Sequence, residues 1–135
     1  MSGEALAVPD FLPAFLEWLR GGLAARGWAG VPVATQVPNP RPPRFARVRH
    51  DATARPHLAL AVATVTVEAW AASEAEADRL GAVCYALACA AEISDPWCYA
   101  PRDATVLGPH PSPDPDSGQD RSVCAVRLAV PVEPI

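Results

Sequence analysis

The stretch PHLALAVATVTVEAWAASEAEADRLGAVCYALACAAE, residues 56–92, decides the fold of this chain. Its first part is rich in β-branched residues, and TVTVEAW at 64–70 ends on an aromatic, which is typical of a strand. The predicted strand runs from His57 to Trp70, about 14 residues, whereas strands usually have roughly 5 or 6. We therefore expect it to bend, or to project beyond the sheet as half of an extended hairpin.

The second part of the same stretch has the start signal and the spacing of a helix. Ser73 is placed to cap the helix, and Glu76 three residues later completes the spacing of a capping box. Apolar and small residues then recur on one stripe, at Ala77, Leu80, Gly81, Cys84, Leu87, Ala88 and Ala91. A strand followed by a helix that covers its sheet is the minimum unit of a two-layer α+β domain.

The remaining elements follow from the same two periodicities. A first helix is predicted from Asp10, as N-cap, to a stop at Gly27 and Gly30; its apolar face is Phe11, Leu12, Phe15, Leu16, Leu19 and Leu23. Strands are predicted at 31–37, starting at a sheet edge because of Pro32, at 45–49, from Trp97 to near Gly108, and at 121–130. The last strand places Cys124, Val126, Leu128 and Val130 on one face, so we expect it inside the sheet. A polar turn is predicted at 50–55 and a surface loop at 108–120, which holds four prolines.

Length and composition limit the class of protein. A chain of 135 residues fits one domain, 1–135, and no apolar run approaches the roughly 20 residues of a membrane span. The N-terminal MSGEALAVPDFL lacks the basic and apolar regions of a secretion signal, so synthesis in the cytosol is expected. The four cysteines contain no C-x-x-C pair, which favours reduced, partly buried thiols over a metal site or a disulfide framework.

The net charge of −4 is unevenly distributed. Residues 1–55 carry seven arginines against four acids, whereas residues 56–135 carry four against eleven, and lysine is absent. Codon preference explains arginine in place of lysine; a role at interfaces, where the planar guanidinium pairs well, is the functional interpretation. The total charge does not favour a nucleic-acid-binding surface, although the first half could present a local basic patch.

The run VPNPRPPRFARVRH, residues 37–50, concentrates this charge. Its prolines exclude a helix and enforce an extended or turning path, so four arginines are held out on a stiff connection: Arg41, Arg44, Arg47 and Arg49. Two interpretations stay open, a solvated hairpin loop and a contact between subunits.

No catalytic constellation is visible in the sequence. His50, His57 and His110 lack the short spacing of a metal motif, and no G-x-S-x-G, P-loop or G-x-G-x-x-G occurs. Asp114, Asp116 and Asp120 resemble a calcium loop only superficially, since the glutamate at its twelfth position is missing. We therefore predict no cofactor, no metal and no enzymatic activity, while an active site assembled from distant residues stays possible.

Four features together resemble one family over about residues 9–130. They are Trp18-Leu19-Arg20, the run VPNPRPPRFARVR, the passage VEAWAASEAEADRL at 67–80, and DPDSGQDRSVCAVRL at 114–128. The chain resembles the tail terminator proteins of long-tailed phages and prophages of high-GC actinobacteria, and is distantly similar to minor tail protein U of lambdoid phages and to terminators of gene transfer agents. The very apolar, alanine-rich segment 58–63 departs from the family's pattern.

The resemblance implies a twisted, mostly antiparallel sheet of about four or five strands with two main helices on one face. It also implies a hexameric ring that caps the tail tube, stops its polymerisation and serves head-tail joining. The implied partners are the chain itself, the tail tube protein and the head completion or stopper proteins. No membrane or specific nucleic acid is implied, though DNA could pass through the ring. The implied place is the virion, at the tail or neck, after assembly in the host cytoplasm.

A ring closed by head-to-tail contacts needs two different complementary patches on each subunit. The charge asymmetry suggests Arg41, Arg44, Arg47 and Arg49 on one side, with Asp114 and Asp116 from the acidic half on the other. Two alternatives stay open. One is another neck component, such as a head-tail connector or tail completion protein. The other is a small cytosolic ligand-binding or enzymatic α+β domain, which would have a concave pocket with converging polar groups.

Overall fold

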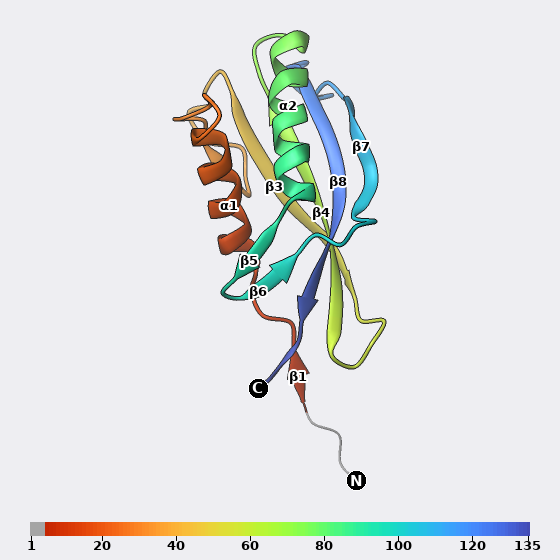
Figure 1. Cartoon of the computed structure of the whole chain (residues 1–135). Coiled ribbons are helices and arrows are strands. Elements are labelled where there is room, and N and C mark those ends of the chain that lie inside the picture. The colour runs from red at the N-terminus through yellow and green to blue at the C-terminus, as the bar shows by residue number, and fades with distance from the viewer. Residues whose placement is uncertain (1–4) are drawn as a thin grey trace.

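Two helices lie on one face of a curled β-sheet in the computed structural model, which describes residues 5–135 (Figure 1). Residues 1–4, which the predicted domain 1–135 includes, lie outside the described residues. The helices are α1 (Leu12–Ala24) and α2 (Glu74–Cys89). The strands are β1 (Leu6–Ala7), β2 (Val33–Ala34), β3 (Phe45–Ala54), β4 (Leu60–Trp70), β5 (Glu92–Ser94), β6 (Trp97–Tyr99), β7 (Thr105–Pro111), β8 (Arg121–Pro131) and β9 (Glu133–Pro134). In the part of the chain that the structure describes, neither helix is long and apolar enough to cross a membrane.

The main sheet has seven strands in the order β2-β3-β4-β8-β6-β5, with β7 also paired to β8. Only the short β2–β3 contact is parallel; every other pair in this sheet is antiparallel. Strands β1 and β9 form a separate two-stranded sheet. The α+β prediction is confirmed, but four or five strands were too few. The difference arises because three-residue strands such as β5 and β6 are too short to show a periodic pattern.

Helix α2 forms as its sequence signals predict. The Ser73 hydroxyl oxygen accepts a hydrogen bond from the Glu76 backbone N–H at 3.2 Å. The buried stripe contains the predicted residues Ala77, Leu80, Gly81, Cys84, Leu87, Ala88 and Ala91. A Cβ built on Gly81 would lie 2.4 Å from Ser122 Oγ, so the α2 backbone lies directly on β8. Burial there also raises the pKa of the Cys84 thiol to about 12.

Helix α1 covers the neighbouring part of the same face. It begins at Leu12 instead of directly after Asp10, and the Asp10 carboxylate accepts weakly from the Leu12 N–H at 3.4 Å. Its buried face matches the prediction at Phe11, Phe15, Leu19 and Leu23. The Trp18 indole N–H donates to the Leu87 carbonyl at 2.8 Å, which ties α1 to α2.

The predicted polar turn at 50–55 is wrong. Strand β3 continues to Ala54, and its pairing with β4 extends to Ala54↔Val62 across a register shift between His50 and Ala52. Backbone hydrogen bonds continue past the point where apolar alternation ends, because strand pairing does not require a buried side chain. The β3–β4 hairpin therefore projects beyond the body of the molecule, one of the two outcomes expected for the long strand (Figure 1). We call its exposed end, residues 50–59, the arm.

The predicted loop at 108–120 is longer than the loop in the structure. The predicted strand at 31–37 is also longer than the observed strand, β2, which has two residues. Strand β7 reaches Pro111 and pairs with β8 through two register shifts, so the loop begins at Ser112. Prolines are tolerated in β7 because it is an edge strand, and the irregularities end its pairing gradually. Strand β8 is central, and Cys124, Val126, Leu128 and Val130 are buried under the helices, as predicted.

Candidate functional site

The face of the sheet that the helices leave uncovered carries a cluster of arginines. Side chains alternate between the two faces of a strand, so three cross-strand rows share this face. The rows are Phe45–Trp70–Arg121, Arg47–Glu68–Val123 and Arg49–Thr66–Ala125. Arg127 follows on the same side of β8, and Arg41 reaches over Trp70 from the preceding connection. We call this surface, defined by Arg41, Arg47, Arg49, Arg121 and Arg127, the basic face.

Glu68 lies at the centre of the basic face and is only 2 % exposed. Its carboxylate oxygens have three guanidinium neighbours, each with a nitrogen at 3.6 Å: Arg47, Arg49 and Arg121. The Trp70 indole N–H donates to Glu68 Oε1 at 3.3 Å. A buried carboxylate is tolerated only with opposite charge and hydrogen bonds around it. Arg49 also pairs with Asp51 at 3.8 Å, so the three arginines face two carboxylates and the cluster keeps a small positive excess.

Trp70 forms the apolar base on which two of the arginines rest. It is stacked on Phe45 with ring centroids 5.0 Å apart and planes inclined by 20°. The guanidinium carbons of Arg41 and Arg121 lie 5.3 and 5.2 Å from the Trp70 ring centroid. This geometry is favourable for a cation over the negative face of an aromatic ring. The basic face is thus held in place by the fold.

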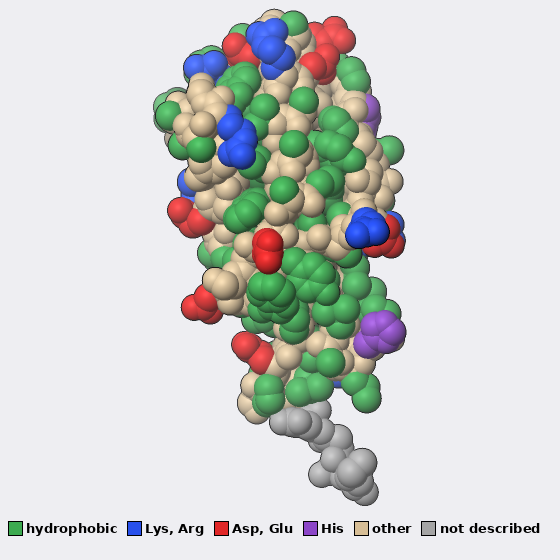
Figure 2. Space-filling model, in the orientation of Figure 1, with side chains coloured by type: hydrophobic (Ala, Val, Ile, Leu, Met, Phe, Trp, Pro, Cys, Tyr) green, Lys and Arg blue, Asp and Glu red, His purple; other side chains and the backbone are tan. Residues whose placement is uncertain are grey.

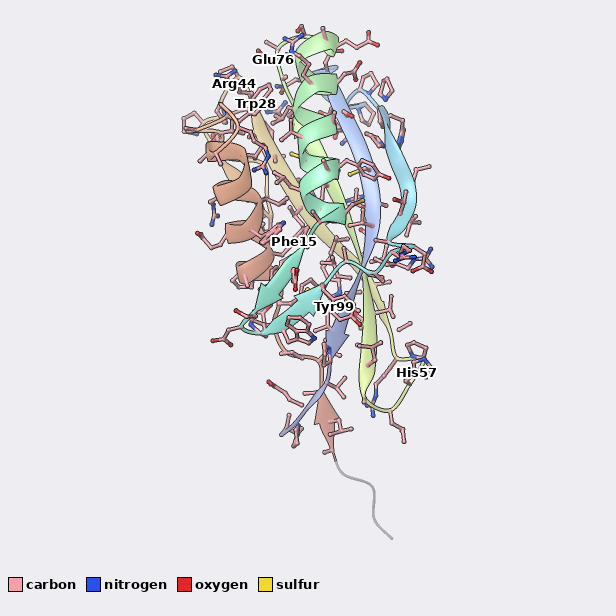
Figure 3. All side chains as sticks on the ribbon, in the orientation of Figure 1. Phe15, Trp28, Arg44, His57, Glu76 and Tyr99 are labelled. Atoms are coloured by element: carbon pink, nitrogen blue, oxygen red, sulfur yellow. The ribbon has the colours of Figure 1, made fainter. Side chains whose placement is uncertain are left out.

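The four arginines predicted as interface residues do not form a single patch. Arg47 and Arg49 contact Glu68, and Arg41 lies over Trp70. Arg44 lies apart, at the start of α2, where its Nη1 is 3.7 Å from Glu76 Oε2 and its guanidinium carbon is 5.5 Å from the Trp28 ring centroid. Figure 3 shows Arg44, Trp28 and Glu76 close together at that end of the molecule. The predicted contact of the four arginines with a neighbouring subunit stays a prediction.

Asp114 and Asp116 lie in the loop between β7 and β8. Asp114 Oδ2 accepts hydrogen bonds from the Ser117 hydroxyl at 2.6 Å and the Ser117 N–H at 3.0 Å. The Ser117 hydroxyl in particular keeps the Asp114 pKa below its ordinary value. Gln119 of this loop accepts from Arg41 at 3.1 Å and donates to the Pro43 carbonyl at 3.4 Å. The two aspartates therefore lie beside the arginine connection, and are not on the opposite side of the subunit.

Exposed acids also occur on α2, in the helix layer, and around the edge strand β5. Glu74 and Asp78 are exposed on α2, and Glu92 and Asp95 are exposed around β5. We call these four residues the acidic set. Figure 2 views the side of the helices and shows acidic and arginine side chains interspersed over it. The acidic set lies in two places, the start of α2 and β5, and supplies carboxylates that could complement the basic face.

Sequence reasoning missed Glu68, Trp70 and Arg121 as members of the site. The available signal was a single carboxylate in the otherwise apolar TVTVEAW strand, which requires a positively charged partner once it is buried. Which arginines reach it depends on the strand register, because Arg47 and Glu68 are cross-strand partners. Register is set by long-range pairing that one strand's sequence does not encode.

The alternative of a ligand-binding or enzymatic domain requires a pocket with converging polar groups. A hollow of about 380 Å³ near the base of the arm contains Asp10, His50 and Thr53. His50 Nε2 lies 2.6 Å from Thr53 Oγ1, and the His50 ring meets Phe11 edge-on at 5.1 Å. Both polar side chains of this pair are exposed on the arm, so neither is shielded from water. No cluster of three or more metal-ligating side chains occurs within residues 5–135.

Neither a family model nor a curated protein matches this sequence.

Proposed function

We propose that this chain is a structural assembly protein of the tail terminator type. Its copies form a closed ring that caps a tail tube, stops tube polymerisation and presents a surface for head-tail joining. The resemblance of four sequence motifs supports this proposal. The structural observation that carries it is the asymmetry of the subunit: the basic face lies on one side of the sheet, and the helices, of which α2 carries part of the acidic set, lie on the other.

This asymmetry suits the contacts of a ring. A head-to-tail ring joins one patch of each copy to a different patch of the next, so the two patches must lie on different sides. Opposite charges on those patches steer association and fix the register of the contact. In our proposal the basic face of one copy meets the acidic set of the next. A twisted, mostly antiparallel sheet with both helices on one side, the family's arrangement, would hold the two patches apart.

Charge reversal with a matched mixture tests this contact. The basic-face variant is Arg41→Glu with Arg127→Glu, because neither residue contacts Glu68 among the described ion pairs. The acidic-set variant is Glu74→Arg with Asp78→Arg, at two exposed positions on α2. Each variant alone should fail to cap the tail tube, since like charges then meet. An equimolar mixture should regain capping, because an even-membered ring can alternate the two variants so that every contact joins opposite charges.

Circular dichroism of each variant checks that the subunit is folded, and Arg102→Glu, an exposed reversal outside both patches, is the matched control. The charge-pairing proposal is wrong if both double variants cap the tube as the unchanged protein does. It is also wrong if both fail and their mixture fails as well. A wild-type protein that leaves tube polymerisation unaffected contradicts the function itself.

Two other functions are separated by different observations. Another neck component would share the asymmetric subunit, and labelled electron microscopy of the particle would find it away from the end of the tube. A ligand-binding or enzymatic domain would depend on the hollow at the base of the arm. In that case His50→Ala would abolish activity on the ligand, whereas a terminator with His50→Ala should still cap the tube.

A further inference from the structure

The side chains of the arm are exposed, although at its base His50 meets Phe11 edge-on and Asp51 accepts a hydrogen bond from Thr66. All residues from 50 to 59 are exposed, and Leu58 near the tip is 81 % exposed. The tip is nevertheless ordered by a hydrogen bond from Arg55 Nη2 to the Leu58 carbonyl at 3.1 Å. A two-stranded hairpin without a packed face is only marginally stable in water. An ordered, apolar-tipped hairpin of this kind is expected to gain its packing from another surface.

A surface of fitting chemistry lies around the β5–β6 hairpin. A hollow of about 250 Å³ there is lined by residues that include Cys89, Glu92, Trp97 and Tyr99. Trp97 is 45 % exposed, and its ring centroid lies 5.5 Å from that of Tyr99. Glu92 and Asp95 are both exposed beside it. We call this surface, Cys89, Glu92, Asp95, Trp97 and Tyr99, the shelf; Figure 2 shows hydrophobic side chains gathered on the lower part of this side.

The tip and the shelf are complementary in polarity and in charge. The tip presents Arg55 and His57 beside the apolar Leu58, whereas the shelf presents two carboxylates beside two aromatic rings. Leucine against an exposed tryptophan removes apolar surface of both from water, and a cation over Trp97 or Tyr99 adds a favourable contact. Carboxylates at the rim attract the arginine of the tip.

The arm does not reach the shelf of its own chain. Cross-strand pairing keeps the arm in line with the sheet as far as Ala54↔Val62. Figure 3 shows His57 at the tip of the arm, well away from Tyr99. A second copy of the chain is therefore the occupant that fits, because it supplies the same basic, apolar tip to the acidic, aromatic shelf.

We propose that the arm of each subunit docks on the shelf of the next, with Leu58 against Trp97. The contact joins two different patches, so it propagates head to tail and belongs to the same class of interface as a ring. This inference rests on the proposed self-assembly and names the segment that performs it. It does not depend on the identity of the tube.

Cysteine cross-linking tests the contact directly. Cys89 lines the shelf and is partly exposed, so the work uses a Cys89→Ser background, in which the three remaining native cysteines are buried. Leu58→Cys and Trp97→Cys chains, carrying different tags, are mixed at high concentration with tube protein present and oxidised mildly. A disulfide should form between the two tags. Replacing Trp97→Cys by Ala25→Cys, an exposed position on the far end of α1, should give none.

A chain carrying both Leu58→Cys and Trp97→Cys distinguishes the geometry of the contact. Head-to-tail docking predicts a covalent ladder that extends beyond the dimer, because each copy offers one tip and one shelf. A ladder that ends at the dimer indicates a two-fold contact and overturns the proposal. Absence of the mixed disulfide overturns it too, as does a disulfide between two Leu58→Cys chains that forms just as readily.

Leu58→Asp provides a second measurement that does not require oxidation. The position is almost fully exposed, so the subunit should fold normally, while self-association should weaken about tenfold or more. If wild-type protein caps the tube but Leu58→Asp assembles equally well, the arm contact is wrong and the ring stands. If the cross-link forms but tube polymerisation is unaffected by wild-type protein, the arm contact stands and the terminator function is wrong.

Discussion

At the scale of single residues, Glu68 is the position on which the basic face depends. Its carboxylate is the negative charge shared by Arg47, Arg49 and Arg121. Arg121 is the most constrained of these partners, because its side chain is only 15 % exposed and its Nε donates to the Ser112 carbonyl at 2.7 Å. Reversing Arg47 would place a second carboxylate beside Glu68. Variants intended to test assembly should therefore avoid these four residues.

Removing the charge of Glu68 should destabilise the fold. Glu68→Gln leaves Arg47 and Arg121 without their counter-charge, while Arg49 keeps Asp51, and we expect a loss of about 3 kcal/mol in the free energy of unfolding. Urea denaturation measures it. The matched control is Glu17→Gln, whose carboxylate is 72 % exposed and pairs with Arg20; this change should cost less than about 0.5 kcal/mol. Equal losses in the two variants would show that Glu68 does not organise the basic face.

At the scale of elements, the contact of α2 with β8 determines how the helix layer sits on the sheet. Gly81 allows the helix backbone to approach Ser122, and a methyl group there would lie 2.6 Å from Ser122 Cβ. Gly21 on α1 has no heavy atom within 4 Å of an added Cβ. The two glycines therefore have different roles, although both occupy helices.

Alanine at these two glycines should have opposite effects on stability. Gly21→Ala should stabilise the chain by up to about 1 kcal/mol, because alanine favours a helix and meets nothing. Gly81→Ala should destabilise it by about 1–3 kcal/mol, since overpacking against Ser122 outweighs the helix preference. Thermal unfolding of both variants measures the difference. A Gly81→Ala protein as stable as Gly21→Ala would contradict the close approach of α2 to β8.

Both helices could be predicted from the sequence, because a cap and a 3.6-residue stripe are local signals. The seven predicted positions of the α2 stripe are all buried, and β8 has its predicted inward face. Strand limits were predicted less well. The extension of β3 through His50 to Ala54 depends on pairing with β4, and the proline-rich β7 forms because β8 offers an edge. Both features depend on pairing with another strand, which the residue pattern within one strand does not predict.

The candidate site, too, could be predicted from the sequence only in part. The prolines of residues 37–50 predicted a segment without a helix, and none forms there, but the grouping of its arginines was not predictable. Arg44 faces Glu76 at the start of α2, whereas Arg47 and Arg49 face Glu68 on the sheet. Successive arginines diverge because alternate residues of a strand point to opposite faces and the preceding connection turns.

At the scale of the whole molecule, the subunit has different surfaces on its two sides and an arm that extends beyond its body (Figure 1). The basic face is unlike the acidic set, and the arm is unlike the shelf, which shares Glu92 and Asp95 with the acidic set. Pairs of unlike surfaces lead to closed rings or open filaments, depending on the rotation between neighbours. A terminator requires closure, since an open filament would extend the tube that it should end.

The most direct test of this account is the mass of the oligomer that purified protein forms in the presence of tail tube protein. The proposal predicts one closed species of defined copy number, hexameric if the resemblance holds, bound at tube ends that no longer grow. A protein that stays monomeric beside tubes of unrestricted length, or that forms filaments without a limiting mass, would contradict it.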